Sequence, residues 1–193
     1  MNLFVPRLAT GDLDEDGTID VVVSEWSVHV LRTKPGPLTT FDDPVIVESG
    51  VNFSMYGVAV RDMNGDGHAD IVSADRTAGA LLVLPGRGDG TFQPAVSTNV
   101  GPTRRDDIAV GDFNHDAIPD VVVVTGSTHV LAVWLGDGTG RFTAAGTFTI
   151  GTTGARFATG DLNGDGNLDV VLIGVGQLCS SFGETARGCW RIR

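Results

Sequence analysis

One ten-residue segment recurs four times along the chain at an almost constant spacing. Its first aspartate stands at positions 12, 62, 112 and 161, so the steps between copies are 50, 50 and 49 residues. A regular period of this size is the signature of an array in which each unit is one supersecondary motif. We therefore expect a single repeat domain of residues 1–193, with units of approximately 1–50, 51–100, 101–150 and 151–193.

An apolar, valine-rich run follows every copy of the segment. The four runs are residues 21–23, 71–72, 121–124 and 170–173. Short runs rich in β-branched residues are typical of buried strands and are too short for helices. Similar apolar stretches stand before or after the segment in several units, at residues 58–60, 108–110, 28–31, 81–84 and 131–135. Each unit therefore predicts a strand, an acidic loop and two further strands.

A turn and a weaker fourth strand complete the expected unit. Gly-rich turns end in Phe92 and Phe142, and Phe41 keeps the same offset in the first unit, where residues 34–37 replace the glycines. Residues 95–97 are an example of the fourth strand. Four antiparallel strands in about fifty residues is the size of one β-propeller blade. The fourth unit ends without its turn and outer strand, so four repeats are expected, the last incomplete.

The charge of the chain is concentrated in the repeated segments. The formal net charge is −11, with 24 Asp and Glu against 13 Lys and Arg, and thirteen aspartates fall within the four segments. Binding to nucleic acid requires a basic surface, so this balance argues against nucleic acid as a partner. Four bound Ca²⁺ ions would bring eight positive charges and reduce the formal net charge to −3. Most of the acidity is therefore interpreted as counter-charge for metal.

The segments have the residue pattern of calcium loops. Ca²⁺ takes about six to eight oxygen ligands, and a tight loop supplies them from alternate positions. Here positions 1, 3, 5 and 9 carry Asp or Asn, position 7 would contribute its backbone carbonyl, and position 6 is glycine in three copies. The sequence predicts one Ca²⁺ site in each unit, with these ligands: Asp12, Asp14, Asp16, Thr18 and Asp20; Asp62, Asn64, Asp66, His68 and Asp70; Asp112, Asn114, Asp116, Ile118 and Asp120; Asp161, Asn163, Asp165, Asn167 and Asp169.

Two other structures have loops of similar composition, the EF-hand and the metal-free turn. An EF-hand needs a bidentate Glu at position 12 and flanking helices, whereas that position holds Val23, Ser73, Val123 and Leu172 and the loops run into strands. A metal-free Asp/Asn/Gly turn is common on protein surfaces. Four loops with carboxylates in phase argue against it, because such closely spaced charges repel one another without a cation.

The third loop departs from the pattern at its turn. Ala117 stands at position 6, where the other loops have glycine. A left-handed backbone conformation costs a residue with a Cβ roughly 1 kcal/mol or more. The site of residues 112–120 is therefore expected to bind Ca²⁺ most weakly.

The sequence contains several further features that do not define a catalytic or adhesion site. Residues 87–89 spell Arg-Gly-Asp, but they lie in the Gly-rich turn and are interpreted as turn chemistry. No nucleophile motif or zinc spacing is present in the sequence, and its histidines fall at unrelated places. A pair of carboxylates for glycoside chemistry stays open, since its geometry is invisible in a sequence. Trp134 is expected in the core, whereas Trp26 and Trp190 are left unassigned.

The repeated loops and their flanking strands resemble the FG-GAP/VCBS repeat family, whose members are similar to the propeller of integrin α-subunits and occur in many secreted bacterial proteins. The resemblance covers approximately residues 8–173. It implies an all-β fold, a β-propeller of four-stranded antiparallel blades with one Ca²⁺ site per blade. It also implies that the chain is part of a larger, seven-bladed propeller; a closed four-bladed propeller or a ring of two chains is the alternative.

The function expected from this resemblance is that of a calcium-binding extracellular scaffold. Its loops would be presented to a protein or carbohydrate partner, and the chain would not itself be catalytic. The alternatives are a propeller or accessory domain of a secreted polysaccharide-acting enzyme, and a purely structural spacer. Open propeller edges would leave unpaired strands, which also allows self-association.

The same features bear on localisation. We expect a secreted or cell-surface protein, because low-affinity calcium loops belong outside the cell, although the first residues of this chain show no signal peptide. No apolar stretch is long enough to insert in a membrane. Cys179 and Cys189 could form a local disulfide, and two free thiols are the alternative.

Overall fold

The fold was obtained as a computed structural model, which describes residues 7–37, 40–47, 55–75, 77–101, 107–125, 130–149, 156–174 and 177–178. Every regular element in this part of the chain is a β-strand. Within the same part, no helix is long and apolar enough to cross a membrane. Cys179, Cys189 and Trp190 lie outside the described residues.

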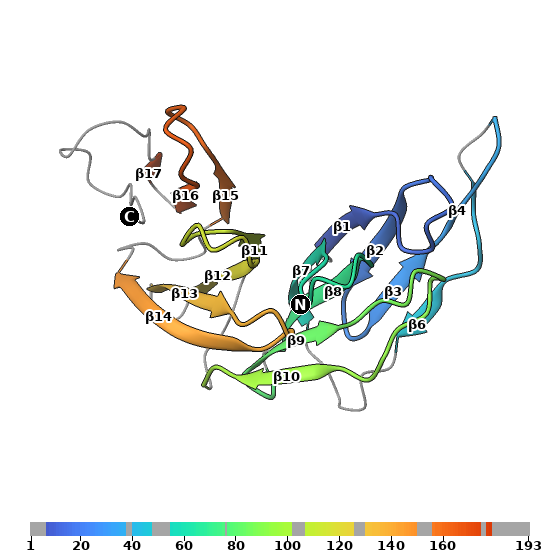
Figure 1. Ribbon diagram of the computed structural model, residues 1–193, viewed down its shortest axis with the longest axis horizontal. Coiled ribbons are helices and arrows are strands. Elements are labelled where there is room, and N and C mark those ends of the chain that lie inside the picture. Colours follow the sequence, from blue (N-terminus) through green and yellow to red (C-terminus); the bar gives the residue numbers. More distant parts are fainter. Residues whose placement is uncertain are drawn as a thin grey trace.

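The strands form one antiparallel sheet per repeat unit (Figure 1). The first sheet contains β1 (Arg7–Gly11), β2 (Asp20–Ser24), β3 (Val28–Leu31) and β6 (Val45–Val47) in that order. The second contains β7 (Met55–Arg61), β8 (Asp70–Asp75), β9 (Ala80–Leu84) and β10 (Val96–Asn99). The third contains β11 (Asp107–Gly111), β12 (Asp120–Thr125), β13 (Val130–Gly136) and β14 (Phe142–Thr149). The fourth contains β15 (Arg156–Gly160), β16 (Asp169–Gly174) and β17 (Gln177–Leu178).

This topology confirms the strand pattern predicted from the sequence. The valine-rich runs form β2, β8, β12 and β16. Each of these strands pairs with the strand before its acidic loop, and the register is the same in all four sheets. The last pairs of the four ladders are Gly11↔Asp20, Arg61↔Asp70, Gly111↔Asp120 and Gly160↔Asp169. One element was not predicted. The first unit adds a two-stranded hairpin, β4 (Thr33–Lys34) and β5 (Thr40–Phe41), where the sequence has proline in place of the Gly-rich turn.

The sheets stack on one another through three apolar clusters. The first joins the first and second sheets and includes Val22 and Ile71; the second joins the second and third sheets and includes Val72 and Val121. The third joins the third and fourth sheets. Successive residues of a strand point to opposite faces, so an inner sheet buries both faces and a terminal sheet only one. Accordingly every residue of β8 is buried, whereas buried and half-buried residues alternate along β2.

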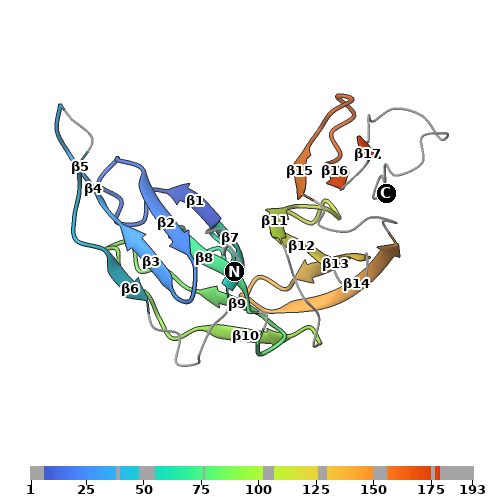
Figure 2. The same cartoon turned by 180° about the vertical axis from the view of Figure 1, so that it is seen from behind.

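The four sheets follow one another along an arc, as Figures 1 and 2 show from opposite sides. β1, β7, β11 and β15 lie on the inner side of the arc, where successive first strands contact one another. β6, β10 and β14 lie on the outer side, and the first and fourth sheets are at the two ends. Trp134 of β13 is half-buried against the second cluster, as expected for a core residue. Trp26 is exposed in the turn between β2 and β3.

Candidate metal-binding loops

Each repeated acidic segment connects the first and second strands of its sheet. The four connections are residues 12–19, 62–69, 112–119 and 161–168. The strand pair on either side fixes both ends of the loop, because the residue before position 1 and the residue at position 9 are paired across the ladder. The sheet therefore holds the first and last acidic residues of each loop close together.

The carboxylate at position 1 organises the turn by accepting backbone hydrogen bonds. Asp62 Oδ1 accepts from the N–H of Gly65 at 2.7 Å and Asp62 Oδ2 from the N–H of Gly67 at 2.9 Å. Asp112 and Asp161 make the same two contacts in their loops. The carboxylate at position 5 in turn accepts the N–H of position 7 in every loop. A carboxylate can accept hydrogen bonds from several N–H groups at once, so these side chains stabilise a tight turn of the backbone around them.

The aspartate at position 9 connects the loop to the end of the third strand of its sheet. Asp70 accepts the N–H of Met63 at 2.9 Å on one oxygen and the N–H of Gly86 at 2.8 Å on the other. Asp20 and Asp120 make the corresponding pairs of contacts. All three side chains are fully buried, and burial raises the pKa of Asp70 and of Asp120 above the ordinary range. This structural role of position 9 was not predicted from the sequence.

The first loop has the strongest negative charge, and its carboxylates are not all satisfied. One oxygen each of Asp12, Asp14 and Asp20 lie within 4.8 Å of one another, an arrangement that can hold a metal ion. Oδ1 of Asp12 and Oδ1 of Asp14 are buried without a hydrogen-bond partner. An orphaned buried oxygen costs free energy unless a donor or cation reaches it. Burial, followed by the charges of Asp20 and Asp16, raises the pKa of Asp14, and the charge of Arg32 offsets this only in part.

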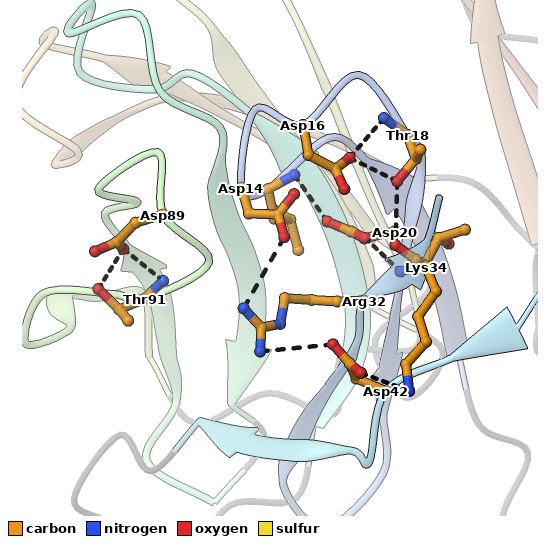
Figure 3. A network of polar contacts seen from close by, with 11 residues as sticks. Asp14, Asp16, Thr18, Asp20, Arg32, Lys34, Asp42, Asp89 and Thr91 are labelled. Carbon is orange, nitrogen blue, oxygen red and sulfur yellow. Dashed lines mark hydrogen bonds and ion pairs between the residues drawn. The ribbon is translucent and has the colours of Figure 1, made fainter. Parts of the chain in front are cut away.

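Figure 3 shows what surrounds the first loop. Arg32 reaches toward Asp14, but its nearest nitrogen stays 4.0 Å from the carboxylate oxygen, while its other end faces Asp42 at 3.8 Å. Asp16 accepts hydrogen bonds from the hydroxyl and N–H of Thr18, which lower the pKa of Asp16. The neighbouring groups thus neutralise the loop only in part, and oxygen-only donors of this kind suit a hard divalent cation.

The other loops replace the position-3 aspartate by asparagine. The amide nitrogens of Asn64 and Asn114 donate to the position-5 aspartates at 2.9 Å and 2.8 Å, and Asn163 lies 3.5 Å from its counterpart. At positions 1, 3, 5 and 9 each of these loops therefore has one negative charge fewer than the first, and Glu15 gives the first loop one more. Among the described residues, three acidic side chains converge within 4.8 Å in the first loop alone. The ligand sets of the other three loops, and the role of the position-7 carbonyls, stay predictions.

The backbone of the loops is left-handed at positions 4 and 6. Position 6 has φ between 66° and 88° in all four loops, with Ala117 at 66° as the sequence predicted. At position 4, Gly65 and Gly164 are also left-handed, but Glu15 and His115 adopt φ of 57° and 64° without being glycine. Such conformations disfavour residues with a Cβ. The third loop therefore contains two strained residues, and the first loop one.

The two strained position-4 residues reach the neighbouring loop. Glu15 Oε1 lies 2.5 Å from His68 Nδ1, and His115 Nε2 lies 2.6 Å from Asn167 Oδ1. In both pairs position 4 of one loop meets position 7 of the next. Both Glu15 and His115 are exposed, and the next sheet brings its loop alongside them. The sequence contains a signal for these contacts: position 4 is Glu15 or His115 in two repeats and glycine in the other two.

The Arg-Gly-Asp tripeptide is part of a hydrogen-bonded turn. Asp89 accepts both the hydroxyl and the N–H of Thr91, at 2.6 Å and 2.9 Å (Figure 3). Asp137 makes the same contacts with Thr139 in the next repeat, where no arginine precedes it. The shared geometry supports the interpretation of this motif as turn chemistry.

A cleft of about 380 Å³ opens between the third and fourth sheets. Its walls combine aromatic and aliphatic side chains with amide and imidazole groups from the two neighbouring loops. The lining residues are Phe113, Asn114, His115, Val133, Leu135, Ala145, Gly146, Phe148, Asn167 and Leu168. Concave sites of about this size and mixed character are where proteins bind small molecules.

Comparisons with known proteins agree with this architecture. The model of the FG-GAP-like repeat matches three times, at residues 12–73, 62–123 and 112–172. The chain therefore belongs to the FG-GAP-like repeat family, and the resemblance stated from the loops is confirmed. The repeats and the stacked sheets together define a β-propeller-like all-β fold. A search of curated proteins finds no match.

One solved structure similar to the chain is that of an Agrocybe aegerita lectin, described as specifically recognising non-reducing terminal N-acetylglucosamine. The two chains are 22% identical and superpose with a TM-score of 0.61. The match covers 89% of this chain and 47% of the lectin chain, so this chain spans about half the length of that protein. At this identity the likeness concerns the fold alone.

Proposed function

We propose that the chain is a calcium-stabilised propeller scaffold that acts outside the cell and binds a partner through its loops and clefts, without catalysis of its own. The orphaned buried oxygens of Asp12 and Asp14 carry the metal part of this proposal. Ca²⁺ would lie among the acidic side chains of each loop, where it would neutralise their mutual repulsion. The loops join the first two strands of every sheet, so a bound ion would hold those strands together.

Thermal unfolding with excess EDTA and then across a millimolar Ca²⁺ titration tests the metal. A ligand that binds only the folded state raises the melting temperature as its concentration rises. Asp14→Ala should reduce the Ca²⁺-dependent rise, whereas the matched control Asp89→Ala, in a turn outside the loops, should leave it unchanged. A melting temperature that is the same in EDTA and in Ca²⁺ would refute the proposal.

For the partner we favour a carbohydrate over a protein. The cleft between the third and fourth sheets offers aromatic side chains together with the amide of Asn167, and sugars are bound through such combinations of apolar faces and hydrogen bonds. The similar lectin is described as recognising a terminal sugar, which gives a starting set of glycans. A panel of glycans with exposed terminal N-acetylhexosamines is the first probe.

The cleft offers a blocking variant that spares the core. A Cβ at Gly146 would meet no atom within 4 Å, so Gly146→Leu should enter the cleft without a clash. It should abolish glycan binding, whereas Thr147→Leu, an exposed neighbour on the same strand, should retain it. Binding that survives Gly146→Leu would exclude this cleft as the sugar site. If no glycan of the panel binds the unaltered chain, the carbohydrate proposal fails and the calcium proposal is unaffected.

A further inference from the structure

The outer face of the first sheet is apolar and exposed. Leu8 pairs with Val23 on β2, Val23 with His29 on β3, and His29 with Ile46 on β6, so the row is apolar except at His29. Leu8 and Ile46, on the two edge strands, are 66% and 55% exposed, and Ile19, the last residue of the acidic loop before β2, is 58% exposed. The alternate residues of the same strands, such as Val22, are buried against the second sheet. The exposed row is therefore the face turned away from the rest of the chain.

The equivalent face is covered in the next repeat. On the second sheet Val58 stands where the first sheet has Leu8, and it is 9% exposed. Ile71 and Leu84 lie on the same face, where the first sheet has Val21 and Leu31, and they are 0% and 1% exposed. They belong to the cluster shared with the first sheet. In the second sheet this face thus packs against the sheet before it. On the first sheet no described residue packs against the equivalent face.

The other end of the array exposes the complementary half of the same contact. Position 2 of an acidic loop points toward the next sheet: Leu13 and Met63 are 1% and 2% exposed in the first and second clusters. Phe113 packs against the third cluster in the same way. Leu162 is the corresponding residue of the fourth loop, and it is 45% exposed.

The glycines that end the first strands show the same difference. A Cβ at Gly11 would lie 2.5 Å from a methyl of Val60, and a Cβ at Gly111 would lie 2.4 Å from a methyl of Leu168. In both places the following sheet fills the space over the glycine. A Cβ at Gly160 would meet nothing within 4 Å, so the equivalent space on the fourth sheet is open.

We propose that the chain associates head to tail with a second copy of itself. The outer face of the fourth sheet, with Leu162 and the open space over Gly160, docks on the outer face of the first sheet, with Leu8 and Ile19 of the second copy. The contact repeats the geometry that already joins successive sheets within the chain. It is heterologous, because two different surfaces meet, and such contacts give rings when the rotation closes and filaments when it does not.

The length of the similar lectin chain favours a second copy of this chain as the partner at the exposed faces. That chain is about twice as long as this one over a common fold, so two copies supply a comparable number of residues. Burying the exposed apolar rows would also remove a patch of the kind that marks interaction surfaces. The proposal does not depend on the carbohydrate site, which lies between the third and fourth sheets of one chain.

The mass in solution is the first test. Light scattering coupled to size exclusion, in Ca²⁺, should give at least twice the monomer mass of 20.1 kDa. Leu8→Asp blocks the head and Gly160→Phe blocks the tail, and each should reduce the mass to that of the monomer. Trp26→Asp, a control at an equally exposed residue in the turn between β2 and β3, should associate as the unaltered chain does. Circular dichroism melting verifies that each variant is folded.

Mixing the two blocked variants distinguishes head-to-tail docking from other modes. A 1:1 mixture retains one intact head and one intact tail, so it should form dimers and nothing larger. Dimers in either variant alone would mean that like faces meet, which overturns the proposal. If the unaltered chain is a monomer at its highest soluble concentration, the proposal is overturned as well. This includes a monomer in which the first and fourth sheets of the same chain contact each other.

Discussion

Replacing Ala117 by glycine isolates the backbone strain of the third loop. Ala117 adopts φ of 66° at the position where the other three loops have glycine. At Gly67 and Gly166, the equivalent positions, an added Cβ would meet no atom within 4 Å. The cost of the alanine is therefore a backbone conformational energy rather than a collision with the surrounding loop.

The expected magnitude follows from two opposing contributions. A left-handed conformation costs a residue with a Cβ roughly 1–2 kcal/mol, and Ala117→Gly removes that cost. Glycine also increases the conformational entropy of the unfolded chain, which lowers stability by about 0.4–1 kcal/mol. The net gain in the free energy of unfolding is about 1 kcal/mol, which corresponds to about 2–4 °C in melting temperature for a domain of this size.

Urea unfolding in EDTA is the appropriate assay, because metal binding then contributes nothing to the difference. The midpoint should rise with an unchanged slope, since the surface exposed on unfolding stays the same. The reciprocal variant Gly67→Ala should lose about as much as Ala117→Gly gains. If Ala117→Gly is neutral or destabilising while Gly67→Ala is clearly destabilising, the third loop relieves its strain by another route and the argument from φ fails.

Three further outcomes are expected. Asp70→Asn should lower the free energy of unfolding by about 2–3 kcal/mol even in EDTA, because the amide cannot accept both backbone N–H groups. Asp66→Asn, at an exposed residue, should lower it little in EDTA. Equal losses for the two variants in urea unfolding would contradict the structural role of Asp70. Gly86→Ala should destabilise by about 1–3 kcal/mol, since its Cβ would lie 2.3 Å from the backbone oxygen of Ala69, whereas Gly146→Ala should not. In a Ca²⁺ titration followed by NMR, the third loop should fill last; early filling would refute its expected weakness.

Local patterns allowed the sheets and loops to be predicted from the sequence. Strands β2, β8, β12 and β16 follow from runs of β-branched residues, and the loops from Asp and Asn in phase. The hairpin β4–β5 was missed because residues 34–37 replace the Gly-rich turn by a proline-containing sequence with no counterpart in the other units. A repeat-based prediction is weakest where one unit departs from the rest.

Contacts between repeats could not be predicted from the sequence pattern of one repeat unit. The pair of His115 and Asn167 joins residues that are separated by 52 positions. The pair of Glu15 and His68 joins residues that are separated by 53 positions. Such contacts depend on how one sheet lies on the next, and neither the period nor the composition specifies that relation.

Position 4 shows how strain and packing are balanced between neighbouring repeats. Gly65 is unstrained in its left-handed conformation, but it has no side chain with which to reach the following loop. Glu15 and His115 carry the strain of the same conformation and each contacts position 7 of the next loop. A glycine at either position would remove the strain together with the contact. The residue at position 4 therefore decides whether it contacts position 7 of the next loop through its side chain, as it does in the first and third loops.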